Sequence, residues 1–217
     1  MTPFEDILQQ INTRRDELFV RADEFVFNDY GAGARDENRS PEIMDIGVKC
    51  KKTLKDFAYI GVKNENAKLL FDIIKNLKPK IILELGCCLG FSSILFKAAF
   101  NKASIYTLEG DLNLANFAKE NFDFFKFKDI KIVVGKFSDT LPKLLPKIDK
   151  IDFAFIDGHH DKNATIRYFE QILPFMNQGS VVAFDDINYN QNMTNAWNMI
   201  KQNRNNKDDG KIGIIWL

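Results

Sequence analysis

The segment Ile81–Phe100 constrains the fold of this chain most, because it is typical of a buried strand that runs through a glycine turn into a helix. Four apolar residues and one acid precede Gly86, and the residues after Gly90 have helical apolar spacing. Such glycines let the backbone approach a ligand closely, and free N–H groups at a helix start favour a negative group. A dinucleotide site needs the pattern G-x-G-x-x-G, but Cys88 and Leu89 separate the two glycines here. The turn therefore suits a nucleoside ligand without a pyrophosphate, and S-adenosylmethionine is the candidate.

The composition favours one α/β domain with a helical extension, since the 217 residues include 45% hydrophobic residues and 20 Phe to fill a core. Lys+Arg and Asp+Glu are equal at 30 each, so no basic stripe indicates a nucleic-acid partner. The N-terminus lacks the features of a signal peptide, and no apolar run approaches the ~20 residues of a membrane span. The three cysteines, Cys50, Cys87 and Cys88, do not suggest a disulfide framework. We therefore expect a cytoplasmic protein without membrane association.

Residues 1–79 are predicted to form an N-terminal helical extension that contributes to the acceptor site or to a dimer. An amphipathic helix is expected over about Pro3–Arg21, and Ser40 followed by proline begins a second helix. Asn64 can cap a third helix, which Pro79 ends.

Between the first two helices lies a polar glycine loop, Asn28–Arg39. Its part from Asp29 to Arg35 could close over the ligand, with Arg35 or Arg39 meeting a carboxylate. A surface turn is the alternative.

Residues 80–217 alternate between strands and helices and are predicted to be the cofactor-binding domain. The expected strands are Ile81–Leu85, Ser104–Leu108, Ile130–Val134, Ile151–Ile156, Ser180–Phe184 and Ile212–Leu217. Helices are expected near Phe91–Phe100, Leu112–Phe124, Ser138–Leu145, Ala164–Met176 and Asn192–Asn203. Apolar strands separated by helices predict a mostly parallel, Rossmann-like α/β sheet covered by helices on both faces. Ligands bind such sheets at the carboxyl ends of the strands, where the strand order reverses.

The ends of the second and third predicted strands carry candidates for binding a nucleoside. Glu109 can accept hydrogen bonds from both ribose hydroxyls, whereas Asp111 is expected to cap the next helix. After the third strand, Phe137 and Ser138 could flank an adenine by packing and by hydrogen bonding. Alternatively, Phe137 belongs to the core and Ser138 caps a helix.

The fourth predicted strand ends at Asp157, and the only two histidines of the chain, His159 and His160, follow it. A loop that faces a ligand favours a functional role for these histidines, although lone histidines are often structural. Asp185 and Asp186 follow the fifth strand, and adjacent carboxylates repel unless a cation, a proton or a donor offsets them. With Asp157 they could bind a divalent metal through oxygen ligands. The alternative is a helix cap and a hydrogen bond that holds the loop of Asp157.

Together these residues resemble the class I S-adenosylmethionine-dependent methyltransferases, and more closely the small O-methyltransferases of the catechol and caffeoyl-coenzyme A type. The resemblance covers about Lys80–Leu217, and the run from Glu84 to Ser92 is similar to the glycine motif that meets the methionine end of the cofactor. It implies cofactor contacts from Glu84, Gly86, Gly90, Ser92, Glu109, Gly135, Phe137, Ser138 and Asp157. It also implies Mg²⁺ or another divalent cation at Asp157, Asp185 and Asp186.

The chain departs from the family pattern in three places. Metal-dependent members have Asp followed by Asn where this chain has Asp185-Asp186, and they have a catalytic lysine at the position of His160. These changes leave a metal-free enzyme or a different acceptor open. The last predicted strand, Ile212–Leu217, looks like the family's sixth, so the seventh, an antiparallel strand inserted between the fifth and sixth, has no candidate.

The sequence thus predicts an enzyme that methylates an oxygen of a small-molecule acceptor, with His160 as base and Asp157 beside it as the candidate catalytic residues. One alternative is a non-catalytic protein of the same fold that binds S-adenosylmethionine. A nicotinamide-dependent oxidoreductase is the other, and the absent middle glycine argues against it. The apolar residues of Ile212–Leu217 would leave an exposed sheet edge, which predicts a two-fold homodimer or a cover of N-terminal helices.

Overall fold

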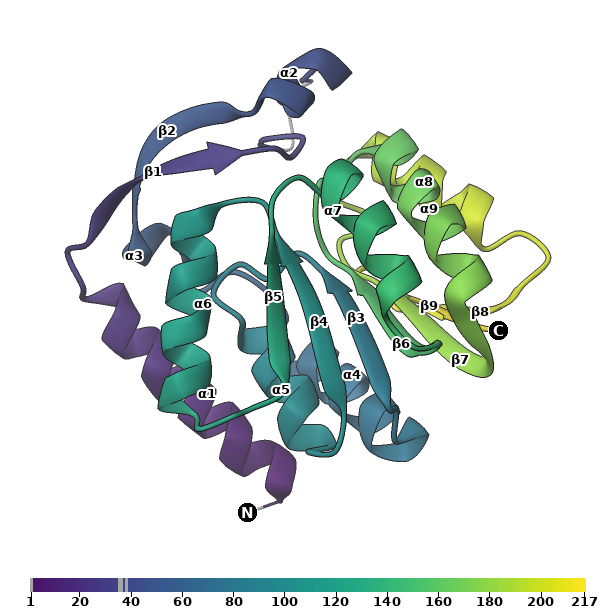
Figure 1. Cartoon of the computed structure of the whole chain (residues 1–217), viewed down its shortest axis with the longest axis horizontal. Helices are drawn as coiled ribbons and strands as arrows, with labels where there is room; N and C mark the ends of the chain where they lie inside the picture. The colour runs from purple at the N-terminus through teal and green to yellow at the C-terminus, as the bar shows by residue number, and fades with distance from the viewer. Residues whose placement is uncertain (1, 35–36, 38) are drawn as a thin grey trace.

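A seven-stranded sheet lies at the centre of the protein, seen here in a computed structural model that describes residues 2–34, 37 and 39–217. Its strands are β3 (Ile81–Leu85), β4 (Ser104–Glu109), β5 (Ile130–Val134), β6 (Ile151–Ile156), β7 (Met176–Phe184), β8 (Asn205–Asp208) and β9 (Gly213–Trp216). They are arranged in the order β5-β4-β3-β6-β7-β9-β8 (Figure 1). β5, β4, β3, β6 and β7 are parallel, and β9 runs antiparallel to both of its neighbours.

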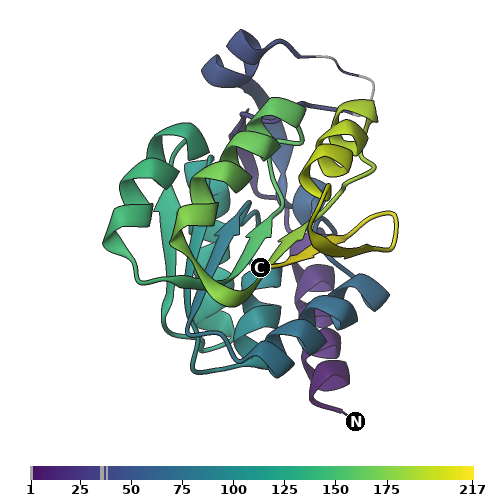
Figure 2. The same cartoon turned by 90° about the vertical axis from the view of Figure 1, so that its right-hand side faces the viewer.

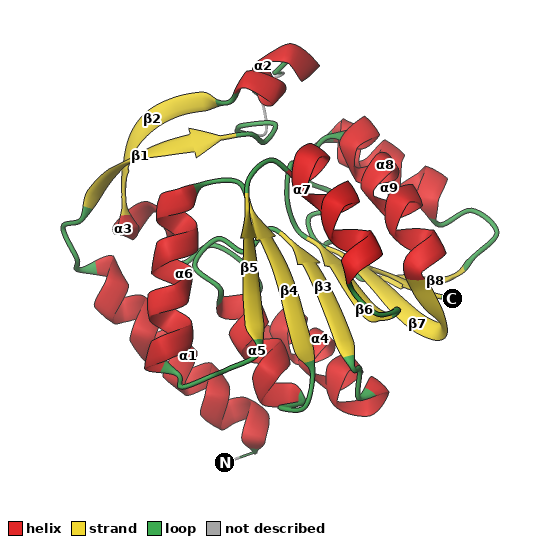
Figure 3. Ribbon diagram, in the orientation of Figure 1, coloured by secondary structure: helices red, strands yellow, loops and turns green. Residues whose placement is uncertain are grey.

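Helices cover both faces of this sheet, as the sequence predicted (Figure 3). They are α1 (Pro3–Phe19), α2 (Pro41–Ile46), α3 (Leu54–Phe57), α4 (Asn64–Leu77), α5 (Phe91–Ala99), α6 (Leu112–Phe124), α7 (Phe137–Leu144), α8 (Lys162–Ile172) and α9 (Gln191–Ile200), with 3-10 turns at Leu145–Lys147 and Leu173–Phe175. Because side chains alternate across a strand, Ile82 packs in the core under α4 and α5, whereas Leu83 packs in the core under α7 and α8. Within the described ranges, every helix is too short or too polar to cross a bilayer.

The parallel strands agree closely with the prediction. β3, β5 and β6 have the predicted bounds, β4 extends one residue further to Glu109, and β7 begins at Met176 rather than Ser180. A strand that is buried on both faces is a continuous apolar run, and such runs are easily located in a sequence.

The C-terminal strands differ from the prediction. β9 is the antiparallel strand inserted between β7 and β8, so the strand that we expected to be missing is present, and β8 is the sixth strand (Figure 2). β8 escaped prediction because its four residues are all polar and exposed. Pairing with β9 and a 2.8 Å hydrogen bond from the Trp197 indole to Asp208 hold it in place.

This change removes the apolar sheet edge on which the homodimer prediction was based. Ile214 and Ile215 of β9 are buried between two neighbouring strands, and the edge strand is the polar β8. The longest N-terminal helix, α1, packs mainly against α3 and α5.

The first 79 residues contain the three predicted helices and also a small antiparallel sheet that was not predicted. This sheet consists of β1 (Glu24–Asp29) and β2 (Val48–Thr53), and it lies beyond the carboxyl ends of β3, β4 and β5 (Figure 1). Ser40 caps α2 as expected, but the cap of α4 is Lys63 rather than Asn64.

The strand order reverses between β3 and β6. The chain proceeds from β3 outward through β4 and β5, and then crosses back so that β6 pairs with the other side of β3. The carboxyl ends of these two strands, at Leu85 and Ile156, therefore open into the crevice where a ligand is expected.

Candidate active site

A cavity of about 710 Å³ lies at this reversal point, and most of the predicted site residues line it. Its walls come from the glycine turn after β3, the loops after β4, β6 and β7, the start of α7 and the N-terminal segment 27–33. Of the predicted residues, those that line it are Gly86, Ser92, Glu109, Phe137, Ser138, Asp157, His160, Asp185 and Asp186. Its volume lies in the range typical of cofactor-sized ligands.

The glycine turn has a backbone conformation that matches its predicted role. Gly86 has φ 106° and Gly90 has φ 79°, both in the left-handed region that favours glycine. A Cβ at Gly90 would lie 2.5 Å from the ring of Phe122, so this glycine allows α6 to pack closely but does not line the cavity. Ser92, in the first turn of α5, does line it.

Glu109 lies at the end of β4, where the sequence placed the ribose acid. Its two carboxylate oxygens accept hydrogen bonds from the backbone N–H of Cys88 at 2.7 Å and of Asp111 at 2.9 Å. Burial raises the pKa of this carboxyl to about 7. Its position is therefore fixed by two backbone donors, and its remaining lone pairs can accept hydroxyl groups. Asp111 caps α6, as predicted.

Glu84 lies behind the cavity rather than in its wall. It is fully buried, and it accepts hydrogen bonds from Ser93 and, at 2.6 Å, from Thr107. Burial raises the pKa of its carboxyl. The side chain of Glu84 points to the sheet face that α5 covers. In place of the predicted contact with a cofactor, it links β3 to β4 and α5.

Phe137 and Ser138 form the first turn of α7 and line the cavity, whereas Gly135 lies in the turn before them and does not. The Phe137 ring also packs edge-on against Tyr168, with centroids 5.9 Å apart. Both predicted roles of Phe137 are therefore compatible. Ser138 is not the helix cap, since that position belongs to Lys136.

The acids after β6 and β7 lie close together, as predicted, but a lysine lies among them. The ammonium of Lys211 is 2.6 Å from Asp185 Oδ1 and 2.5 Å from Asp186 Oδ1. Burial and the charges of Asp185 and Asp186 raise the pKa of Asp157 well above its usual value. Lys211 was missed in the sequence because it lies in a polar turn, where no local pattern distinguishes it from a solvent-exposed lysine.

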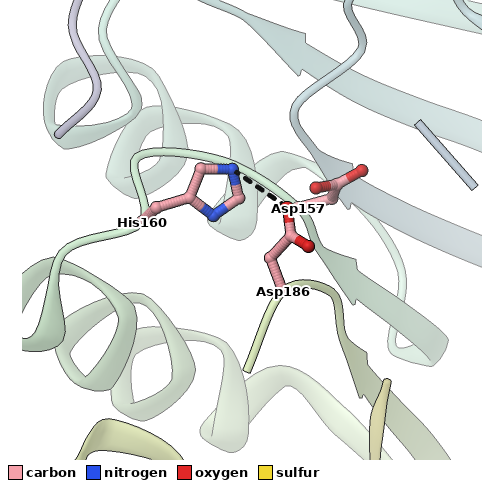
Figure 4. Close-up of side chains that lie close together, drawn as sticks. All are labelled: Asp157, His160 and Asp186. Atoms are coloured by element: carbon pink, nitrogen blue, oxygen red, sulfur yellow. Dashed lines mark ion pairs between the residues drawn. The ribbon is translucent and has the colours of Figure 1, made fainter. Parts of the chain in front are cut away.

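His160 lies on the same side of the cavity as this acid pair. Its Nε2 is 3.9 Å from Asp186 Oδ2 (Figure 4). Its ring stacks on Tyr189, with centroids 4.8 Å apart. Burial lowers the pKa of the imidazole. His159 has a different environment, because its Nδ1 is 3.1 Å from the hydroxyl of Tyr168.

Among the residues that the structure describes, Asp157, His160 and Asp186 form a group whose candidate metal-donor atoms lie within 4.8 Å of one another (Figure 4). The predicted metal set contained Asp185 in place of His160. Asp185 is not in the observed group, and its carboxylate is bonded to Lys211.

The segment 28–33 crosses the cavity and closes one of its sides. The Ala32 N–H donates to the carbonyl of His159 at 2.7 Å, and the Tyr189 hydroxyl donates to the carbonyl of Gly33 at 2.6 Å. Tyr30 packs on Gly110, where a Cβ would lie 2.9 Å from its ring. The glycine loop predicted to close over the ligand does line the cavity, and we name residues 28–33 the strap.

Of the two arginines that the sequence proposed for this loop, only Arg39 belongs to the described residues. Arg39 binds Asp29 at 2.7 Å and Glu37 at 2.7 Å, so it holds the base of the strap. Arg35 lies outside the described residues.

Comparisons with known proteins agree with this geometry. A family model described as a methyltransferase domain matches residues 83–187. The catechol O-methyltransferase of Niastella koreensis is 31% identical over 131 residues, which cover 59% of this chain and 58% of that protein. The catechol O-methyltransferase of Mus musculus is 23% identical over 132 residues, which cover 59% of this chain and 50% of that protein. The chain thus spans between 50% and 58% of the length of these curated relatives.

An O-methyltransferase from Bacillus cereus, solved in complex with SAH, has the same fold. It superposes with a TM-score of 0.62 at 19% sequence identity, over 75% of this chain and 85% of that chain.

Proposed function

Because this chain belongs to the class I S-adenosylmethionine-dependent methyltransferases, we propose that it moves the methyl group of S-adenosylmethionine to an oxygen of a small-molecule acceptor. One observation carries this proposal: a single cavity is lined by both the donor-binding and the proton-accepting candidates. Gly86 of the glycine turn, Glu109 and His160 all line it.

The donor half of the site matches the parts of the cofactor. Glu109 accepts the two ribose hydroxyls, and the turn from Gly86 to Ser92 meets the methionine end. Phe137 and Ser138 flank the adenine. Glu84 and Gly135 shape this half from outside the cavity.

The transfer step requires alignment and the removal of one proton. The acceptor oxygen attacks the methyl carbon, the carbon–sulfur bond breaks, and S-adenosylhomocysteine leaves. The hydroxyl proton goes to His160. Its lowered pKa keeps the imidazole neutral near neutral pH, which is the form that accepts a proton. Asp157 lines the same part of the cavity and borders the path of the methyl group.

A divalent cation is the alternative to this step that the sequence predicted, because a His160 imidazole that binds a metal through its free nitrogen is no longer available as the base. Its ligands would be Asp157, His160 and Asp186. An imidazole among the donors suits a transition metal better than Mg²⁺. Loss of turnover in a chelator would favour this alternative over the metal-free step.

Isothermal titration with S-adenosylmethionine and S-adenosylhomocysteine tests the proposal, followed by mass spectrometry of a panel of phenolic, alcoholic and carboxylic acceptors. We expect binding of both ligands and a gain of one methyl group on an acceptor. No binding at about millimolar ligand would contradict the proposal. Binding without turnover on any acceptor would favour the non-catalytic alternative.

The remaining predictions concern domains, partners and location. We propose that residues 80–217 bind the cofactor and that residues 1–79 cover the acceptor side through the strap. We expect no nucleic-acid partner and a cytoplasmic location. A two-fold homodimer stays a prediction, although the edge strand of the sheet is polar. Light scattering at micromolar concentration tests whether the protein is a dimer.

A further inference from the structure

Lys211 is fixed by the backbone opposite the acid pair. It lies in the turn between β8 and β9, and its carbonyl accepts a 3.0 Å hydrogen bond from the N–H of Ile187. Its own N–H donates to Asp209 Oδ1 at 2.9 Å. Because Ile187 directly follows Asp186, this pairing sets Lys211 beside the two carboxylates whenever β9 is in place.

The side chain of Lys211 contacts the acid pair and also lines the cavity. Its ammonium contacts Asp185 and Asp186, and the same side chain lines the cavity and is 39% exposed. Asp185 is only 2% exposed, so its charge needs a partner inside the protein. The ammonium supplies this partner and still has a side open to a ligand.

We propose that Lys211 is the resident cation of the acceptor site, so that its ammonium takes the place of a divalent cation at Asp185 and Asp186. This inference rests on the proposed function. When the acceptor hydroxyl loses its proton to His160, a negative charge grows on its oxygen, and the ammonium of Lys211 stabilises that charge. The oxygen–methyl bond then forms as the methyl–sulfur bond breaks, and the step needs no metal.

The same arrangement disfavours a metal at the neighbouring group of donors. A divalent cation on Asp157, His160 and Asp186 would share the carboxylate of Asp186 with an ammonium 2.5 Å from its Oδ1. Two cations that share one carboxylate lie close to each other, and they repel strongly in a half-buried site. The ammonium and the metal are therefore alternatives, and removal of the ammonium should create room for the metal.

The test is a titration of the full-length chain with Mn²⁺, followed by electron paramagnetic resonance, together with turnover before and after treatment with a chelator. We expect the unmodified protein to bind Mn²⁺ no more tightly than about 1 mM and to keep its turnover in the chelator. Lys211→Met should bind Mn²⁺ at least about tenfold more tightly, whereas Lys211→Arg, which keeps the charge, should not. Lys207→Met, at an exposed lysine on β8, is the matched control and should behave as the unmodified protein.

Three outcomes would overturn the proposal. The first is Mn²⁺ binding to the unmodified protein with a dissociation constant below about 0.1 mM, provided that Asp157→Asn removes this binding. The second is loss of turnover in the chelator. The third is a Lys211→Met variant that folds but gains no affinity for Mn²⁺. If Lys211→Met does not fold, the first two measurements still decide. The metal titration does not depend on S-adenosylmethionine, so failure of the proposed function is recognised separately, by the absence of cofactor binding.

Discussion

The backbone of Gly86 lies so close to that of Asp157 that a Cβ at Gly86 would be 1.8 Å from the Asp157 carbonyl oxygen. The amide of Asp157 also donates to the carbonyl of Leu85 at 2.8 Å. The glycine turn, which we propose meets the donor, and the acidic loop, which we propose meets the acceptor, are therefore in direct contact. This contact keeps the two halves of the site at one separation.

Gly86→Ala should disrupt both halves of the site. The added Cβ clashes with backbone, which cannot move aside, and the residue has φ 106°, so we expect a loss of about 3 kcal/mol or more in the free energy of unfolding. Gly179→Ala is the matched control, because it has φ 77° but no atom within 4 Å of its Cβ. It should lose only about 1–2 kcal/mol. Urea unfolding of both variants measures the difference, and equal losses would show that the contact with Asp157 is unimportant.

The affinity for S-adenosylhomocysteine should depend on pH through Glu109. Its pKa of about 7 means that the ionised fraction rises from about a tenth to about nine tenths between pH 6 and pH 8. Because we propose that the ionised form accepts both ribose hydroxyls, binding should tighten about tenfold over this interval. Glu109→Gln should bind about 10–100-fold more weakly and lose this pH dependence. Titration calorimetry at both pH values tests this, and an unchanged slope in the variant would assign the effect to another group.

His160 and His159 can be compared by the same substitution. Both have positive φ, of 51° and 71°, and asparagine tolerates that conformation, so His160→Asn and His159→Asn should both fold. His160→Asn should lower turnover about 10²–10⁴-fold near neutral pH, with partial recovery at high pH, where the acceptor ionises unaided. His159→Asn should have a much smaller effect, since its Nδ1 contacts Tyr168. A full loss in His159→Asn with none in His160→Asn would reverse the assignment.

Tyr30 should contribute to cofactor binding from the strap. Its ring packs on Gly110, next to Glu109, and lines the cavity. Tyr30→Ala would open this wall, and we expect about a tenfold loss of affinity for S-adenosylhomocysteine from the apolar contact alone. Tyr30→Phe keeps the ring and should bind nearly as the unmodified protein does. If both variants bind equally weakly, the hydroxyl rather than the ring is responsible.

The family, and the strand-end residues that line the cavity, could be predicted from sequence because they depend on local patterns. The buried strand β3 is a continuous apolar run, and the glycines after it mark a turn that other residues adopt poorly. Glu109 ends β4 and Asp111 lies two residues later, so the predicted end of the strand was enough to locate both residues. The α/β fold and the methyltransferase family follow from such local features taken in order.

What the sequence by itself determined is thus the order of elements and the residues at each strand end. Only the tertiary structure decided which of these residues meet. Lys211 reaches the acid pair through the pairing of β9 with β7, and the polar β8 exists because β9 offers it a partner. The strap lies about 50 residues before β3 in the chain, and it reaches the cavity in the same way, through contacts with His159 and Tyr189. Contacts between residues distant in the chain follow from strand register and packing, and a single sequence does not encode these in any local pattern.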